Sequence, residues 1–209
     1  MNYQDIINNP AYTELASVKH DEIKPFLAGE ISRNPVWARV ANMYQLLGIF
    51  TFILGVFKAF MPFYAHREGK YLIALGAGLL FTFTVLIALH ELIHALAYVC
   101  VGARKLSFGM KLRKFMFYVQ ADGEVLDYKQ FRIVALAPAV LVTLLSVVGM
   151  ALCYNQPLFY FFIPVLGLHS LFCGGDFGLL CFFQNRPDND IVTFDLKKES
   201  TTYFYGKNK

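Results

Sequence analysis

Residues His90 to His94 read HELIH and lie in an almost unbroken apolar run, YLIALGAGLLFTFTVLIALHELIHALAYVCV, from Tyr71 to Val101. On a helix, positions four apart share one face, so His90 and His94 can both offer an imidazole nitrogen to one zinc ion. Glu91 then sits beside a zinc-bound water. The three residues could be grouped by chance, but ionisable groups in a membrane-spanning segment are costly and need a reason. The motif therefore predicts a metal site inside a membrane.

The composition also points to a membrane protein. Hydrophobic residues make up 56% of the 209 residues and charged residues only 16%, which is more apolar than a soluble domain of this size. Four apolar stretches are each long enough to span a bilayer as a helix, namely Ala41 to Ala65, Tyr71 to Val101, Ile133 to Cys153 and Pro157 to Phe183. The sequence predicts an all-α integral membrane protein with about four transmembrane helices.

The second apolar stretch is too long for one perpendicular span. Gly76 and Gly78 near its start suggest either a break or a strong tilt. We therefore expect its buried part to begin near Leu79.

The distribution of Lys and Arg predicts the topology. The N-terminal arm, the loop from Val101 to Arg132 and the C-terminal tail carry sixteen of them, whereas the opposite side has only Arg67 and Lys70. By the positive-inside rule, both termini and the central loop lie in the cytoplasm of a multi-pass cell-membrane protein. The first residues are polar and mixed in charge, so no cleavable signal peptide is expected.

Three regions follow from this topology: a cytoplasmic arm over residues 1–40, a membrane domain over 41–183 and a cytoplasmic tail over 184–209. The arm could hold a short amphipathic helix or be a solvated lead-in. The net charge of +4 reflects topology and attraction to lipid, so the bilayer is expected as a partner and nucleic acid is not. Oligomeric state is not indicated.

A catalytic zinc ion needs three protein ligands, so the box needs a partner elsewhere. Asp176 is the one acidic residue in the other apolar stretches. Counted from the helix ends, it reaches roughly the same depth as the two histidines, about 10 to 16 Å from the cytoplasmic boundary. A site of His90, His94 and Asp176 is therefore expected, although Asp176 could instead serve a structural helix–helix contact.

His169 and Cys173 precede Asp176 on roughly the same helix face. Either could replace Asp176 as the third ligand. For His169 we favour a role beside the ligands, holding a carboxylate or donating to an oxyanion, over that of a plain interior histidine. Cys173 is interpreted as packing.

The loop between the second and third apolar stretches predicts a half-buried strand or hairpin. Apolar residues alternate along KLSFGMKLRKFMFYVQADG, and Asp122-Gly123 is a turn signal. Such a strand could pair with an unwound substrate segment, or merely anchor the hairpin at the lipid surface. The side chains that would contact a substrate strand are Leu106, Phe108, Met110, Phe115 and Phe117.

The HELIH box near the cytoplasmic end of one span, the GD-containing helix two spans later and the RIVALAPAV segment between them resemble the site-2 protease class of intramembrane zinc metalloproteases. More narrowly, they resemble small bacterial zincin peptidases related to that class. The resemblance covers about Tyr71 to Phe183 and implies zinc held by His90, His94 and Asp176. Glu91 is then the general base.

The last motif departs from the pattern of that class. Site-2 proteases usually carry an asparagine upstream of the aspartate and a glycine after it, whereas here His169 stands upstream and the glycines precede Asp176. The resemblance implies hydrolysis of a peptide bond in a membrane protein that has a transmembrane segment. The rival reading is a membrane metal-binding scaffold or ion-handling protein without hydrolysis, but retention of Glu91 and the lack of repeats argue against it.

Overall fold

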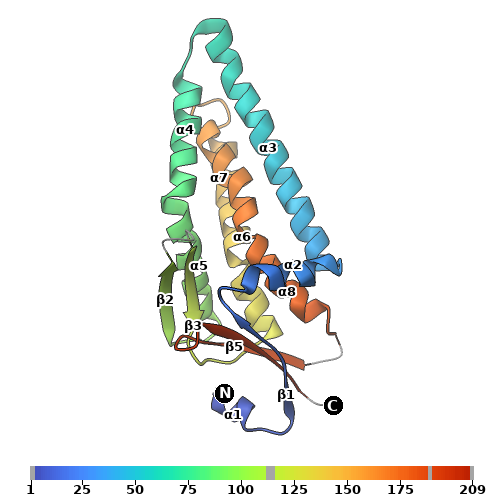
Figure 1. The fold of residues 1–209 in the computed structure, drawn as a ribbon. Coiled ribbons are helices and arrows are strands. Elements are labelled where there is room, and N and C mark those ends of the chain that lie inside the picture. Colours follow the sequence, from blue (N-terminus) through green and yellow to red (C-terminus); the bar gives the residue numbers. More distant parts are fainter. Residues whose placement is uncertain (1–2, 112–115, 188–189, 208–209) are drawn as a thin grey trace. The chain divides into compact units, whose positions relative to one another are not determined.

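The computed structural model describes residues 3–111, 116–187 and 190–207 of the chain (Figure 1). Within them the chain forms eight helices, namely α1 Tyr3–Ile7, α2 Ile23–Ser32, α3 Val36–His66, α4 Lys70–Phe83, α5 Val85–Cys100, α6 Tyr128–Leu152, α7 Phe159–Phe172 and α8 Gly174–Gln184. The same residues include six strands, namely β1 Tyr12–Lys19, β2 Leu106–Lys111, β3 Met116–Ala121, β4 Leu126–Asp127, β5 Asp190–Leu196 and β6 Thr201–Lys207.

The chain divides into two compact units, each described by itself. The first unit comprises Met1–Arg39, Glu91–Ala137 and Gly175–Lys209. The second comprises Val40–His90 and Pro138–Gly174. α5 contributes to both, because the boundary falls inside the HELIH box.

The described residues are mostly helical, as predicted, but the all-α class is not exact, because the first unit contains a four-stranded antiparallel sheet in the order β1-β6-β5-β4. β1 pairs with β6, so that Tyr12 lies opposite Lys207 and Lys19 opposite Thr201. The segment interpreted as an amphipathic helix or a lead-in thus contains a strand as well as α2. Its alternation is weak and its partner lies at the other end of the chain, so the local pattern gives no sign of the pairing.

The predicted β-hairpin is present in the first unit as β2 and β3. Leu106 lies opposite Ala121, and Lys111 lies opposite Met116. The expected turn residue Gly123 follows β3 and leads into β4, with φ of +69°. A residue with a side chain is strained in that conformation, which explains the glycine.

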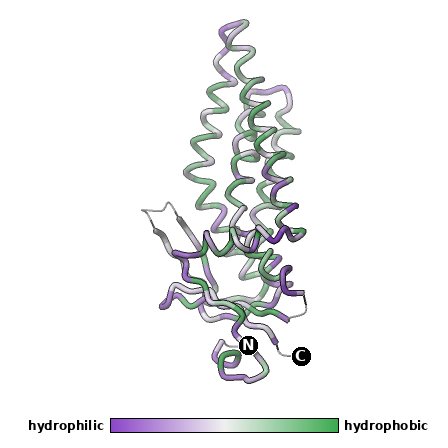
Figure 2. The backbone as a smooth tube through the Cα atoms, turned by 45° about the vertical axis from the view of Figure 1, so that its right-hand side comes forward, coloured by the Kyte–Doolittle hydropathy of each residue, from purple (hydrophilic) through white to green (hydrophobic). Residues whose placement is uncertain are grey.

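Three segments are long and apolar enough to cross a membrane: α3, α6 and the joined α7–α8 segment Phe159–Gln184. α4 and α5 form a fourth candidate if they count as one span, bent by 48°. Figure 2 shows hydrophobic residues along most of these helices. Among the described residues, three or four candidate spans therefore agree with the prediction of about four.

The bend between α4 and α5 lies at Thr84, not at Gly76 or Gly78, which lie in the middle of α4. The hydroxyls of Thr82 and Thr84 each donate a hydrogen bond to the carbonyl oxygen four residues earlier, at 2.7 and 2.6 Å. Such bonds often bend a helix. Gly78 instead lets α4 approach α7, because a Cβ there would lie 2.3 Å from the carbonyl oxygen of Phe161.

α6 begins at a capping box. The N–H of Gln130 donates to the carboxylate of Asp127 at 2.8 Å, and the N–H of Asp127 donates to the side-chain oxygen of Gln130 at 3.1 Å. This reciprocal pair satisfies two backbone donors and fixes where the helix starts.

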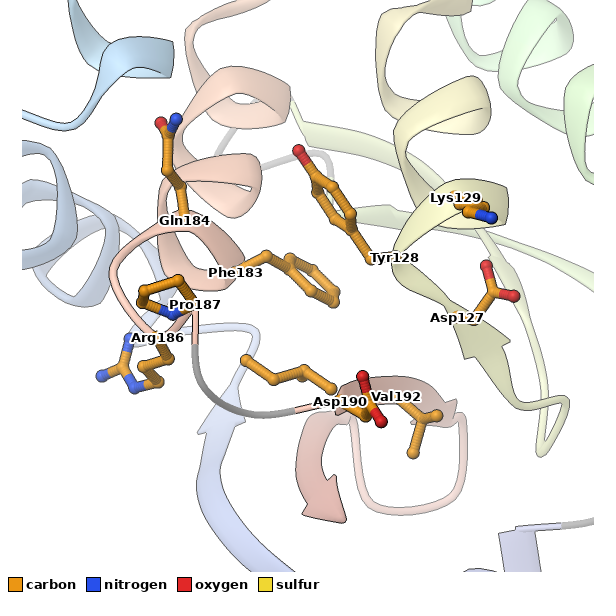
Figure 3. A pocket seen from close by; sticks show the side chains of 10 residues that line it. Asp127, Tyr128, Lys129, Phe183, Gln184, Arg186, Pro187, Asp190 and Val192 are labelled. Atoms are coloured by element: carbon orange, nitrogen blue, oxygen red, sulfur yellow. The ribbon is translucent and has the colours of Figure 1, made fainter. Parts of the chain in front are cut away.

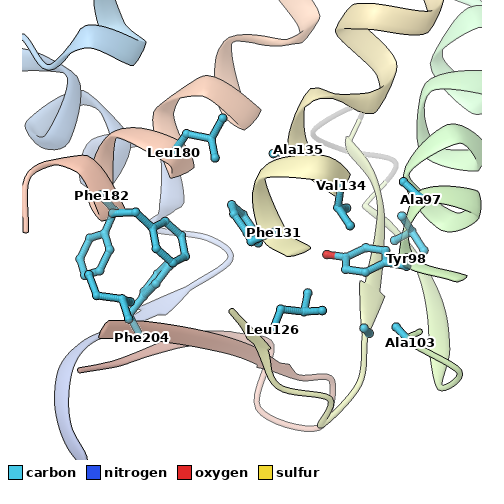
Figure 4. Close-up of a cluster of buried hydrophobic side chains, with 14 of the residues drawn as sticks. Ala97, Tyr98, Ala103, Leu126, Phe131, Val134, Ala135, Leu180, Phe182 and Phe204 are labelled. Atoms are coloured by element: carbon cyan, nitrogen blue, oxygen red, sulfur yellow. The ribbon is translucent and has the colours of Figure 1, made fainter. Parts of the chain in front are cut away.

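The hydrophobic core of the first unit packs α5, α6 and α8 against strands of both sheets (Figure 4). The rings of Phe182 in α8 and Phe204 in β6 lie 4.1 Å apart, and those of Phe131 in α6 and Phe183 in α8 lie 5.1 Å apart. Because the core joins these elements, it fixes the helices that carry the candidate site residues of this unit.

Glu30 in α2 anchors the chain that follows α8. Its side chain is buried, and its carboxylate accepts two hydrogen bonds from Arg186, both 2.9 Å, and one from Asn185 at 2.7 Å. Burial favours the neutral acid, but the hydrogen bonds and charge of Arg186 outweigh it, so the pKa of Glu30 falls below 4.5.

Replacing Arg186 by alanine should lower the free energy of unfolding by about 3 kcal/mol, because it leaves a buried carboxylate without its charged partner. Because the pKa of Glu30 is lowered in the folded state, its stabilising effect is present above pH 4.5 and is lost as the pH falls through the lowered value. Denaturant titration in detergent at several pH values measures both effects.

The control is Lys70→Ala, which removes an exposed ion pair with Glu68. Its effect should stay below about 0.5 kcal/mol. Equal losses in the two variants would contradict the role assigned to Arg186.

Candidate metal centre

The HELIH residues lie on α5, so His90 and His94 share a helix face one turn apart. Both imidazoles are buried, with 7% and 8% of the residue exposed. An apolar helix with two buried imidazoles on one face is the local arrangement that the sequence predicted.

His94 is oriented by the backbone of α6. Its Nδ1 lies 3.0 Å from the carbonyl oxygen of Val134. Because a carbonyl only accepts hydrogen bonds, Nδ1 must carry the proton, and in the neutral ring Nε2 then offers a lone pair. A backbone carbonyl that fixes the tautomer in this way is common for metal-binding histidines.

Asp176 lies in the first turn of α8 and faces His94. Its Oδ1 is 3.3 Å from Nε2 of His94. A charge-assisted hydrogen bond is usually shorter, about 2.7 to 2.9 Å. Two ligands bound tetrahedrally to zinc at about 2.0 to 2.1 Å lie about 3.3 Å apart. The donor set and its spacing therefore fit a zinc ion, which His94 and Asp176 could hold together with His90.

The carboxylate of Glu91 is held by the hairpin. Its Oε2 accepts a hydrogen bond from the backbone N–H of Val119 in β3, at 3.0 Å. A hydrogen bond from an N–H stabilises the ionised carboxylate, which is the form that a general base requires.

In the second unit, His90 contacts the pair that the sequence singled out as alternative ligands. Its Nδ1 lies 3.0 Å from Nε2 of His169, and Sγ of Cys173 lies 3.7 Å from Nδ1 of His169. His169 and Cys173 have no exposed surface. The ligand atoms of all three residues lie within 4.8 Å of one another, so this group too could hold a metal ion by distance alone.

Four of the five predicted substrate-strand residues lie in the hairpin strands, Leu106, Phe108 and Met110 in β2 and Phe117 in β3. Leu106 packs against the core of the first unit, and Phe108 is 60% exposed. Met110 lies opposite Phe117 in the ladder, and Phe115 lies outside the described residues.

Two groups at the site are backbone atoms that sequence analysis missed, the carbonyl of Val134 and the N–H of Val119. No residue type signals such a group, since every non-proline residue carries both. Only the packing of α6 and β3 against α5 identifies them.

The first unit also contains a cavity of about 630 Å³ between the start of α6, the end of α8 and β5 (Figure 3). The aromatic rings of Tyr128 and Phe183 form part of its wall, and Asp127, Lys129 and Arg186 contribute charge. The predicted site residues do not line it.

A family model described as "Putative zincin peptidase" matches residues 83–191, just over half of the chain. The matched range contains α5, both hairpin strands, α6, α7 and α8, and thus every residue proposed to bind metal. No curated protein and no solved structure matches the chain.

Purified protein should contain about one zinc ion per chain, and His94→Ala and Asp176→Ala should each lose it, because each removes one of three ligands. Elemental analysis after removal of weakly bound metal measures the content. The matched control is His20→Ala, which removes another buried histidine of the first unit. Zinc retained in Asp176→Ala but lost in His20→Ala would show that the site has been placed wrongly.

Proposed function

Because the chain belongs to the zincin peptidase family, we propose that it is an intramembrane zinc metallopeptidase of the site-2 protease type. It would hydrolyse a peptide bond of a membrane protein near the cytoplasmic leaflet. The observation that carries the proposal is the contact of His94 with Asp176 at a spacing suited to zinc, on a helix that also presents His90 one turn earlier.

The apolar surroundings of the site support an intramembrane location. α5 carries the box and joins α4 in a candidate span, and Asp176 lies in another candidate span, Phe159–Gln184. Ionisable residues in such segments usually mark a functional site. A metal site in a soluble zinc peptidase has no need of such helices.

In the proposed reaction, Glu91 accepts a proton from the attacking water and delivers it to the nitrogen of the leaving amine. The N–H of Val119 donates a hydrogen bond to Oε2 of Glu91 and so orients the carboxylate. His94 keeps its proton on Nδ1, which donates a hydrogen bond to the carbonyl oxygen of Val134, and so presents Nε2 to the site. When bound, zinc polarises the scissile carbonyl and makes water a nucleophile at neutral pH.

The substrate class follows from the proposed location. A transmembrane or membrane-edge segment must be unwound before its backbone can be cut, because a helix shields its peptide bonds. The β2–β3 hairpin contacts Glu91 through Val119, so an extended segment paired with the hairpin would lie beside the base. The positive-inside distribution of Lys and Arg supports a cytoplasmic position for this hairpin and both termini.

Replacing Glu91 by glutamine should leave the zinc content unchanged and lower kcat for cleavage of model transmembrane substrates by about 10²–10⁴-fold, because the amide cannot accept the proton. The assay compares it with wild-type protein in the same detergent. Cleavage by Glu91→Gln at the wild-type rate would refute the mechanism. A wild type that binds zinc and cuts none of the substrates would favour the metal-binding scaffold.

Replacing Phe108 by alanine should raise KM several-fold with little change in kcat, because the exposed ring would contact the substrate strand and not the reacting bond. Cleavage kinetics over a range of substrate concentrations measure the two constants. Leu47→Ala, which trims an exposed apolar residue of α3, is the control. An unchanged KM would support the hairpin as an interfacial anchor alone.

A further inference from the structure

Each histidine of the box in α5 has a ligand-type atom of another helix close to it, and the two spacings differ. Nε2 of His94 and Oδ1 of Asp176 are 3.3 Å apart, which fits two ligands of one zinc ion. Nδ1 of His90 and Nε2 of His169 are 3.0 Å apart, which is a usual length for a hydrogen bond from nitrogen. The spacing between His94 and Asp176 suits a metal ion bound to both atoms, and the spacing between His90 and His169 suits a hydrogen bond.

Cys173 extends the second pair. It lies four residues after His169, at the end of α7, and its Sγ is 3.7 Å from Nδ1 and 3.9 Å from Nε2 of His169. The ring of His169 also packs against Phe172, with centroids 6.3 Å apart. All of these contacts lie within the second unit.

α7 is held firmly where it carries His169. A Cβ at Gly48 in α3 would lie 2.2 Å from the hydroxyl oxygen of Ser170, and one at Gly167 would lie 2.7 Å from the carbonyl oxygen of Gly48. The two helices therefore touch through their backbones, as small residues allow in membrane helices. His169 is thus presented to His90 from a rigid support.

We propose that His169 and Cys173 form a hydrogen-bonded chain that fixes the tautomer and orientation of His90. The proposal rests on the proposed function, in which Nε2 of His90 binds zinc. Nδ1 of His90 then carries the proton and donates a hydrogen bond to Nε2 of His169. The proton of His169 lies on Nδ1, beside the sulfur of Cys173. His169 and Cys173 are positioning residues and bind no metal.

In the proposed hydrogen-bonded chain, Nε2 of His169 accepts the hydrogen bond from Nδ1 of His90. The carbonyl oxygen of Val134 has the same role for Nδ1 of His94. Partners of this kind usually change metal affinity by about 10–100-fold when removed. An imidazole adds no negative charge to the site, unlike the carboxylate that serves this purpose in many zinc proteins.

The test measures zinc affinity by chelator competition on the full chain in detergent. His169→Leu should weaken zinc binding by about 10–100-fold, because it removes the acceptor. His169→Gln should recover most of the loss, since its side-chain oxygen can reach the position of Nε2. A purely structural role for His169 predicts no such recovery. If His169→Leu fails to fold, the ratio between His169→Gln and wild type still tests the proposal, and it should stay below about tenfold.

Cys173→Ala tests the second link, with Cys181→Ala as the matched control. Both cysteines are fully buried and neither is in a disulfide, but Cys181 lies in α8 in the first unit. Cys173→Ala should weaken zinc binding several-fold and shift the visible spectrum of the cobalt-substituted protein, whereas Cys181→Ala should do neither. Equal effects of the two variants would overturn the role of Cys173.

Cobalt also separates this proposal from a second metal site. A thiolate bound to cobalt gives an intense charge-transfer band. If the cobalt-substituted wild type shows this band and Cys173→Ser lacks it, then Cys173 binds the metal and the proposal fails. Unchanged zinc affinity in His169→Leu would also overturn the proposed role of His169. The proposed function would still hold in that case if wild-type protein cleaves substrate and His94→Ala loses zinc. If wild-type protein binds no zinc, the proposed function itself is refuted.

Discussion

A histidine nitrogen and an aspartate oxygen that face each other 3.3 Å apart in an apolar protein need a positive charge between them. The carbonyl of Val134 holds the proton of His94 on Nδ1, so in the neutral ring the contact with Asp176 joins two acceptors. Either a proton or a metal ion at Nε2 makes the contact favourable, and the 3.3 Å spacing is longer than a usual charge-assisted hydrogen bond and fits two ligands of one zinc ion. Two local features position the groups of this contact. α5 and α8 pack in one hydrophobic core, and the capping box fixes the start of α6, the helix that contains Val134.

The polar groups of the HELIH box lie in apolar helices, and each has a specific partner. His94 has a backbone carbonyl, Glu91 has a backbone N–H of the hairpin, and His90 has a second histidine. Buried polar groups without such partners would cost about 1 to 3 kcal/mol each. The same contacts that satisfy the hydrogen-bonding groups of these side chains also fix their orientations.

The two ends of the chain depend on each other for their structure. β1 near the N-terminus completes a sheet with β6 near the C-terminus, and Glu30 is tied to Arg186 after α8. Neither end would bury enough apolar surface alone, because strands need neighbours and short helices are marginal in water. The predicted arm and tail are therefore parts of one folded element in the first unit.

The sequence by itself determined the apolar spans, the hairpin and the candidate metal-binding box, because helix length, strand alternation and the spacing of HELIH are local properties. It also put Asp176 forward as the third ligand, from its depth in an apolar stretch. Tertiary structure alone decided the terminal sheet, the bend at Thr84 and the hydrogen-bond partner of each HELIH side chain. Those features join residues far apart in sequence, and several use backbone atoms that every residue carries, so no pattern along the chain could reveal them.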